Sequence, residues 1–144
     1  MKTIFTIGYT QKSAKNFFEI LTKNKIDILI DIRLNNTGQL AGFTKKDDLQ
    51  YFLKIFNISY EYWKDFAPTK ELRDNYHKTK NWNDYEIVYK KLLKDRKVIN
   101  KIDFSKYHNK TIVLLCSEPK ADRCHRRLAA EEISKITGKE IGHL

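Results

Sequence analysis

The chain has 144 residues, 41% of them hydrophobic and 12% aromatic, which is the size and composition of one globular domain and excludes a disordered chain. No apolar run approaches the roughly 20 residues that span a bilayer, and residues 1–13 are too short and too interrupted for a signal peptide, so we expect a cytoplasmic protein with free thiols and no membrane partner. The net charge of +10 favours nucleic acid or other anionic partners, although 22 of the 28 cationic residues are lysines, which is typical of a solvated surface.

The first 33 residues predict a strand, a helix and a second strand. Residues 3–8 form a β-rich run that stops at Gly8. Residues 14–25 carry apolar side chains at helical spacing, with Ser13 as the N-cap. Residues 26–33 are an almost continuous apolar run, as in a strand that is covered on both faces.

The middle of the chain is less regular. Residues 34–43 predict a polar loop, and residues 44–56 predict a helix with Thr44 as its N-cap. Residues 58–63 predict a short strand. Residues 64–81 are ambiguous, and one interpretation is a helical turn or two in residues 70–78, after Pro68.

The last third of the chain returns to a clear alternation. Residues 83–97 predict a helix, residues 110–116 a buried strand and residues 122–137 a helix that stops at Gly138, with a final short strand within residues 139–144. We therefore expect an α/β fold, a single-domain three-layer sandwich with a mainly parallel sheet.

Polar residues follow three of these strands, where a parallel sheet brings them to one edge. Ligands of open parallel sheets bind outside the carboxyl ends of the strands, so we expect one pocket there. The candidate residues are Tyr9 and Thr10 after the first strand, Asp31 and Arg33 at the end of the second, and Cys116, Glu118, Arg123, Cys124, His125 and Arg126 around the last strand and helix.

The start of the last predicted helix has the features of an anion site. Its N–H groups are unpaired and carry partial positive charge, and Arg123 and Arg126 add forked donors that suit a phosphate. Arginine often only solvates a helix face, but cations in the first turn oppose the helix dipole, so we favour an anion site. Arg33, Tyr9 and Thr10 are the other expected anion-binding residues.

The two cysteines are candidate nucleophiles. Cys124 falls in the first turn of the predicted helix, where the dipole and the arginines should lower the pKa of its thiol; the equal alternative is a small core residue. Cys116 ends a buried strand, which favours a structural role unless the crevice exposes it. Helix neighbours point about 100° apart, so His125 is a better base for Cys116 or for a substrate than for Cys124.

Neither a metal nor another cofactor is expected. The cysteines lack a Cys-x-x-Cys spacing, and two neighbouring helix residues rarely face one ion. A disulfide between Cys116 and Cys124 is sterically feasible but is not expected in a reducing cytoplasm.

Acidic and aromatic residues allow both structural and functional interpretations. Asp31 and Arg33 share one face of their strand, which fits a structural salt bridge; in a site, Asp31 would orient a histidine or accept a proton and Arg33 would bind an anion. Glu118 is a candidate general base. The aromatic run at residues 60–63 suggests base stacking, but aromatic strand residues are mostly core.

Four motifs resemble the family known as domain of unknown function 488, across almost the whole chain. They are Ile-Gly-Tyr-Thr near the start, Leu-Ile-Asp-Ile-Arg, Leu-Leu-Cys-Ser-Glu followed by Cys-His-Arg, and the closing Ile-Gly-His-Leu. The resemblance implies an α/β fold, no established reaction, and signature positions at Asp31, Arg33, Cys116, Glu118, Cys124, His125 and Arg126. The segments LNNTGQLAGF and WKDFAPTKELR depart from the family's pattern. Six residues separate Cys116 from Arg123, more than in the anion loops of rhodaneses and cysteine phosphatases.

These features predict a small enzyme that acts on a phosphate-bearing substrate, a nucleotide or a nucleic acid, at the carboxyl edge of the sheet. The arginines would bind phosphate, Glu118, His125 or Asp31 would move protons, and Cys116 or Cys124 would be the nucleophile. The alternative is a non-catalytic basic module that binds nucleic acid through its surface. The sequence does not indicate an oligomeric state.

Overall fold

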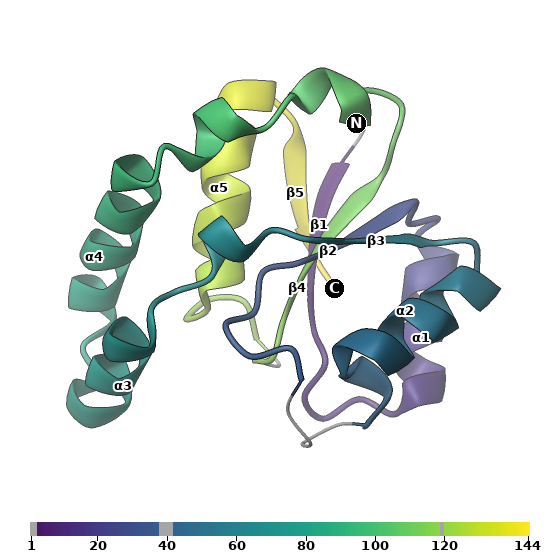
Figure 1. Ribbon diagram of the computed structural model, residues 1–144, viewed down its shortest axis with the longest axis horizontal. Helices are drawn as coiled ribbons and strands as arrows, with labels where there is room; N and C mark the ends of the chain where they lie inside the picture. Colours follow the sequence, from purple (N-terminus) through teal and green to yellow (C-terminus); the bar gives the residue numbers. More distant parts are fainter. Residues whose placement is uncertain (1–2, 38–41, 119) are drawn as a thin grey trace.

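The structure is a computed structural model of the chain and describes residues 3–37, 42–118 and 120–144. Within these residues, five strands form one sheet in which all neighbours are parallel (Figure 1). The strands are β1 (Thr3–Gly8), β2 (Ile28–Asp31), β3 (Ser59–Tyr62), β4 (Ile112–Cys116) and β5 (Glu140–His143). Their order across the sheet is β3-β2-β4-β1-β5, so β4 lies between β1 and β2. The predicted parallel sheet is confirmed.

Helices connect the strands. The described α-helices are α1 (Ala14–Lys23), α2 (Lys46–Ile55), α3 (Lys70–Thr79), α4 (Trp82–Asp95) and α5 (His125–Thr137). The described 3-10 helices are η1 (Gly42–Thr44), η2 (Lys64–Phe66), η3 (Val98–Lys101) and η4 (Phe104–Tyr107). The N-cap of α1 is Ser13, as predicted, because its side chain accepts a hydrogen bond from the Asn16 N–H at 3.0 Å.

The helices cover both faces of the sheet, which confirms the three-layer α/β architecture. On one face, α1 and α2 bury Phe17 and Leu49 against Leu29 and other strand residues. On the opposite face, α4 and α5 bury Tyr89 and Ile133 in a second cluster. Every residue of β4 is buried, as its apolar run predicts for a central strand.

The connections of adjacent strands diverge at the carboxyl edge of the sheet. β1 and β2 lead to α1 and α2 on the first face, whereas β4, which lies between them, leads to α5 on the other face (Figure 1). Ligand crevices of open parallel sheets form where adjacent connections leave to opposite faces. The end of β4 is therefore where a ligand crevice is expected.

Two helix starts differ from the prediction. α2 begins at Lys46, because Thr44 belongs to η1, and its N-cap Lys45 makes no capping hydrogen bond through its side chain. α5 begins at His125 rather than at residue 122, because the preceding residues form a turn in which the Cys124 N–H donates to the Ala121 carbonyl at 3.1 Å. Cys124 is thus the N-cap of α5 and does not lie in its first turn.

Two irregular segments have more structure than the sequence indicated. Residues 64–81 contain η2 and α3, and the segment between α4 and β4 contains η3 and η4. Of the predicted loop at 34–43, residues 38–41 lie outside the described part of the chain.

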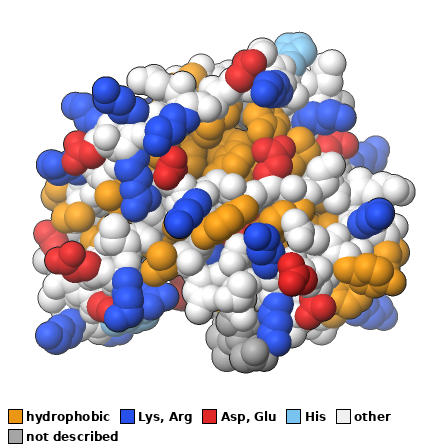
Figure 2. Space-filling model, in the orientation of Figure 1, with side chains coloured by type: hydrophobic (Ala, Val, Ile, Leu, Met, Phe, Trp, Pro, Cys, Tyr) orange, Lys and Arg blue, Asp and Glu red, His pale blue; other side chains and the backbone are white. Residues whose placement is uncertain are grey.

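Cationic side chains do not form one patch on the face that Figure 2 shows. On that face, lysine and arginine are interspersed with acidic side chains. An anion site on this protein therefore depends on local geometry more than on the overall charge.

In the described ranges, no helix is both long and apolar enough to cross a membrane.

Candidate functional site

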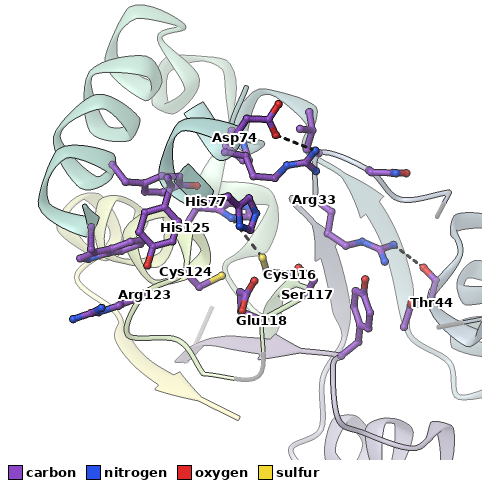
Figure 3. Close-up of a pocket in the computed structure, with 18 residues that line it drawn as sticks. Arg33, Thr44, Asp74, His77, Cys116, Ser117, Glu118, Arg123, Cys124 and His125 are labelled. Carbon is purple, nitrogen blue, oxygen red and sulfur yellow. Dashed lines mark hydrogen bonds and ion pairs between the residues drawn. The ribbon is translucent and has the colours of Figure 1, made fainter. Parts of the chain in front are cut away.

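A cavity of about 420 Å³ opens at the carboxyl edge of the sheet, next to the end of β4 (Figure 3). Its walls come from the residues after β1, β2 and β4, from the start of α5, and from α3 and α4. The expected convergence of the strand ends is therefore present, and α3 adds a wall that was not expected.

Three buried side chains with ionisable groups meet at the floor of this cavity. They are Cys116, Cys124 and His125, which are 4%, 3% and 6% exposed. The Cys116 Sγ lies 3.5 Å from the His125 Nδ1, and the two sulfurs and a ring nitrogen all lie within 4.8 Å of one another. Both cysteines are free thiols.

The start of α5 explains why neighbouring residues can face the same point. Cys124 has an extended backbone, with φ −138° and ψ 143°, whereas His125 is the first helical residue. The divergence of about 100° expected for two helix neighbours therefore does not apply. Cys124 and His125 both lie against Cys116, the last residue of β4.

His125 is held in one orientation by the backbone. Its Nε2 lies 2.8 Å from the Ile32 carbonyl oxygen, which can only accept a hydrogen bond, so Nε2 carries the hydrogen. The Nδ1 therefore faces the Cys116 sulfur, and the structure brings this histidine to Cys116. The group that orients His125 is this carbonyl and not Asp31, which corrects the orienting role considered for Asp31.

The two thiols have opposite electrostatic environments. The Cys124 thiol donates a hydrogen bond to the Cys116 sulfur, and this bond and the nearby His125 hold the pKa of Cys116 well below its ordinary value despite burial. Burial and the bond to Cys116 raise the pKa of Cys124, so the expected lowering is wrong for this residue. Burial lowers the pKa of His125. The negative charge of Cys116 and the hydrogen bond to its sulfur have a larger, opposite effect, so the pKa of His125 is raised.

Backbone N–H groups also surround the sulfurs. The backbone N–H of Glu118 contributes to the lowered pKa of Cys116, and the backbone N–H of Arg126 opposes the rise in the pKa of Cys124. N–H groups near a sulfur favour the thiolate over the thiol. The loop after β4 and the first turn of α5 therefore both stabilise negative charge on sulfur.

Asp31 holds Arg33 in place and does not itself line the cavity. Its carboxylate makes a bidentate ion pair with Arg33, with both N···O distances at 2.9 Å, and accepts a hydrogen bond from the Tyr60 hydroxyl at 2.6 Å. Arg33 lines the cavity and lies over the Tyr9 ring at 5.5 Å, whereas Asp31 does not line it. Asp31 is therefore a positioning residue for Arg33.

The other expected anion-binding residues divide into two groups. Arg123 is exposed, lines the cavity, and has no hydrogen bond or ion pair to any residue that the structure describes. Arg126 is buried and does not line the cavity, because its side chain donates to the Thr6 hydroxyl and to the Glu118 carbonyl. Thr10 also lies outside the lining and instead donates its N–H to the Ser117 carbonyl at 3.0 Å. Arg126 and Thr10 thus hold the loop after β4 in place.

Sequence reasoning missed the wall that α3 contributes. Arg73 and His77 both line the cavity and are one helical turn apart, so they lie on the same face of α3. The sequence allowed a helical turn or two after Pro68, but it did not indicate that these residues line the cavity; the spacing of Arg73 and His77 was the available signal. Glu118, the candidate base, lines the cavity as an exposed side chain.

The floor of the cavity allows two kinds of chemistry. A thiolate beside an imidazole is the arrangement of a cysteine nucleophile with its base. Two sulfurs and one imidazole nitrogen are also the donor set of a metal site, and among the described residues Cys116, Cys124 and His125 could hold an ion.

The fold and the site together define the class: an α/β protein with a wholly parallel sheet and a polar cavity at its carboxyl edge. The family model described as domain of unknown function DUF488 matches residues 13–133, and the chain belongs to this family. The matched range includes Asp31, Arg33 and the whole floor of the cavity. No match was found among curated proteins or among solved structures.

Proposed function

We propose that the protein is an enzyme that acts on a phosphate-bearing substrate held in the cavity at the end of β4. The observation that carries the proposal is the meeting of Cys116, Cys124 and His125 at the floor of a cavity whose rim includes exposed side chains. Burying ionisable groups costs free energy, and catalytic sites are where proteins most often accept that cost. A module that only binds nucleic acid through its surface has no need of such a floor.

The rim supports an anionic substrate. Arg123, in the turn before α5, and Arg73, in α3, line the cavity from two different segments, and His77 lies one turn from Arg73. Arginine presents planar forked donors that match phosphate oxygens. The carboxylate of Asp74, the residue after Arg73 on α3, lies 3.4 Å from the Lys70 Nζ and 3.7 Å from the Arg73 guanidinium. Arg123 is therefore the residue we expect to contact phosphate first.

The size of the cavity favours a small substrate. A volume of about 420 Å³ lies within the range of small-molecule pockets. A mononucleotide or another small phosphate ester suits it better than duplex nucleic acid. In this proposal Glu118 transfers protons, Arg33 and Arg123 bind the anion, and Cys116 acts beside His125 as a nucleophile or as a metal ligand.

Calorimetric titration with inorganic phosphate and with a nucleoside monophosphate tests the proposal. We expect Arg123→Gln to weaken binding by roughly ten-fold or more, because a hydrogen bond to a charged group contributes about 1.5–3 kcal/mol. Lys106→Gln is the matched control, since it removes one positive charge from η4 and does not line the cavity. Turnover of any phosphate ester that binds should be lost in Cys116→Ala. Equal effects of the two charge substitutions, or no phosphate binding by the wild type, would contradict the proposal.

A further inference from the structure

The three side chains at the cavity floor have the spacing of metal ligands. With Zn–S bonds of about 2.3 Å and Zn–N bonds of about 2.0–2.1 Å, a tetrahedral ion holds sulfur and nitrogen ligands roughly 3.6 Å apart. The Cys116 Sγ and the His125 Nδ1 lie 3.5 Å apart, and the Cys124 Sγ lies within 4.8 Å of both groups. An ion fits between the three donor atoms with only small adjustments of the side chains.

The groups behind the donor atoms match those of metal sites. A histidine that binds a metal usually donates its other ring N–H to a carbonyl or carboxylate, and the Nε2 of His125 donates to the Ile32 carbonyl. Cys116 ends β4, Cys124 and His125 lie at the start of α5, and the carbonyl that orients His125 follows β2. Three segments of the chain therefore bring the donor atoms and their support together.

The charge of the cluster is compatible with a divalent ion. Two thiolates, one neutral imidazole and a divalent cation are neutral overall, and metal binding releases the thiol protons. Thiolate and imidazole ligands favour zinc among the common divalent ions, since magnesium and calcium take oxygen ligands.

We propose that Cys116, Cys124 and His125 bind one Zn²⁺ ion and leave its fourth position open to the cavity. Three protein ligands with an open position are the arrangement of catalytic rather than structural zinc sites. Such an ion would supply a Lewis acid and a bound water of lowered pKa at the cavity floor. Glu118 lines the same cavity and carries the carboxylate that would exchange a proton with that water.

Two features of the sequence argued against a metal, and the structure removes one of them. Cys124 is the extended N-cap of α5, so it does not diverge from His125 as two helix residues would. The other ground was the missing Cys-x-x-Cys spacing, but here the loop after β4 and the start of α5 bring distant residues together. The inference rests on the proposed function for the role of the ion, but its detection does not depend on substrate.

Metal reconstitution of the reduced, chelator-treated full chain tests the inference. We expect one Zn²⁺ per chain, protection of both thiols from a reporter reagent, and, with Co²⁺, sulfur-to-metal charge transfer together with the visible bands of a tetrahedral ion. The Co²⁺ spectrum needs no variant, so it is decisive even if a substitution prevents folding. Less than one ion per chain at saturation, or a Co²⁺ spectrum without charge transfer from sulfur, would overturn the proposal.

Variants then assign the ligands. Cys124→Ser should keep the start of α5, because serine is a favourable N-cap, and should weaken Zn²⁺ binding by more than about 100-fold, since even changes behind the ligands cost roughly 10–100-fold. His77→Gln is the matched control, because His77 lines the same cavity without joining the cluster. Unchanged Zn²⁺ binding by Cys124→Ser would refute the ligand set. Zinc binding without phosphate binding would reject only the proposed function, and phosphate binding without zinc would reject only this inference.

Discussion

Gly8 is the residue that lets the loop after β4 close over the sheet. It pairs with Cys116 in the register of β1 and β4. A Cβ at this position would overlap the Glu118 carbonyl oxygen and lie 2.9 Å from the Arg126 Nη1. The need for glycine here is therefore steric, and it arises from residues more than 100 positions away.

We expect Gly8→Ala to lower the free energy of unfolding by about 1–3 kcal/mol, as overpacking of a buried site typically does. Gly42→Ala is the control, because no heavy atom lies within 4 Å of its added Cβ, and it should change stability by less than about 0.5 kcal/mol. Urea unfolding of both variants measures the difference. Equal stabilities would show that the loop does not pack on Gly8.

The ion pair of Asp31 and Arg33 gives a second prediction at this scale. Both residues are buried, at 0% and 5% exposed, so Asp31→Ala leaves an unpaired guanidinium and should cost about 3–5 kcal/mol. The exposed pair of Lys91 and Asp95, at 2.7 Å, provides the contrast, and Asp95→Ala should cost about 0–1 kcal/mol. Denaturant unfolding of the two variants measures both losses of stability. Similar losses would mean that burial does not matter to the Asp31–Arg33 pair.

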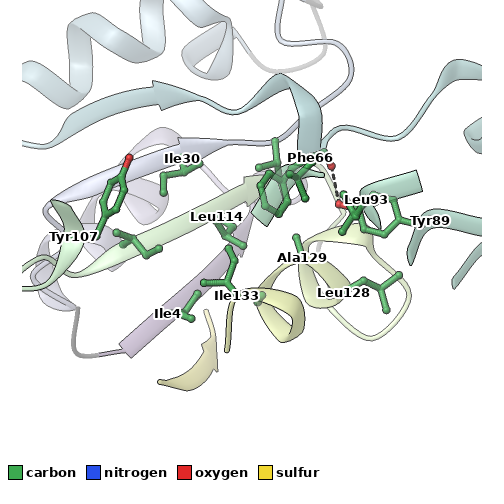
Figure 4. Close-up of a cluster of buried hydrophobic side chains, with 14 of the residues drawn as sticks. Ile4, Ile30, Phe66, Tyr89, Leu93, Tyr107, Leu114, Leu128, Ala129 and Ile133 are labelled. Carbon is green, nitrogen blue, oxygen red and sulfur yellow. Dashed lines mark hydrogen bonds between the residues drawn. The ribbon is translucent and has the colours of Figure 1, made fainter. Parts of the chain in front are cut away.

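At the scale of elements, α4 shows how one helix separates core from surface. Leu93 is buried in the apolar cluster that α4 shares with α5 and the sheet, and the nearby Tyr89 donates its hydroxyl hydrogen to the Phe66 carbonyl at 2.6 Å (Figure 4). Ile87 lies on the same helix and is 68% exposed. The helical spacing of the apolar residues therefore describes only one face of α4.

Leu93→Ala should lower the free energy of unfolding by about 2–5 kcal/mol, because it opens a cavity in the core. Ile87→Ala should change that energy by less than about 0.5 kcal/mol, since it removes only exposed surface. Thermal melts followed by circular dichroism compare the two. A larger loss for Ile87→Ala would contradict the orientation of α4.

Elements with a strong local pattern were predictable, and elements fixed by distant contacts were not. β4 is a run of five buried residues, and Ser13 caps α1, so both could be read from the sequence. The start of α5 could not, because Asp122 is a good N-cap residue by type while the turn from Ala121 to Cys124 delays the helix. The 3-10 helices before β4 carry no periodic pattern that a sequence could reveal.

For the whole molecule, the edge of the sheet that carries the site followed from strand parallelism alone. The roles of the individual side chains at this edge could not be predicted in the same way. Arg126 and Arg123 look equivalent in sequence, but contact with Thr6, 120 positions away, buries Arg126 and leaves Arg123 on the rim. Similarly, Arg73 and His77 reach the cavity only because α3 packs beside α4 and forms one of its walls.

The distribution of charge gives a prediction for nucleic acid. With a net charge of +10 and cations interspersed with acidic side chains on the face in Figure 2, we expect weak duplex binding that falls steeply with salt. Arg123→Gln and Lys106→Gln should reduce this binding equally, since each removes one positive charge. Fluorescence anisotropy at several salt concentrations measures how the affinity of each variant for duplex DNA falls with salt. Tight binding that depends on Arg123 alone would instead favour a nucleic-acid site at the cavity.

The most direct measurement is a crystal structure after soaking in tungstate, a heavy analogue of phosphate with a strong anomalous signal. The account predicts one anomalous peak inside the cavity, within hydrogen-bond distance of the Arg123 guanidinium and above the Cys116 sulfur. Peaks found only outside the cavity, with none near Arg123, would contradict it.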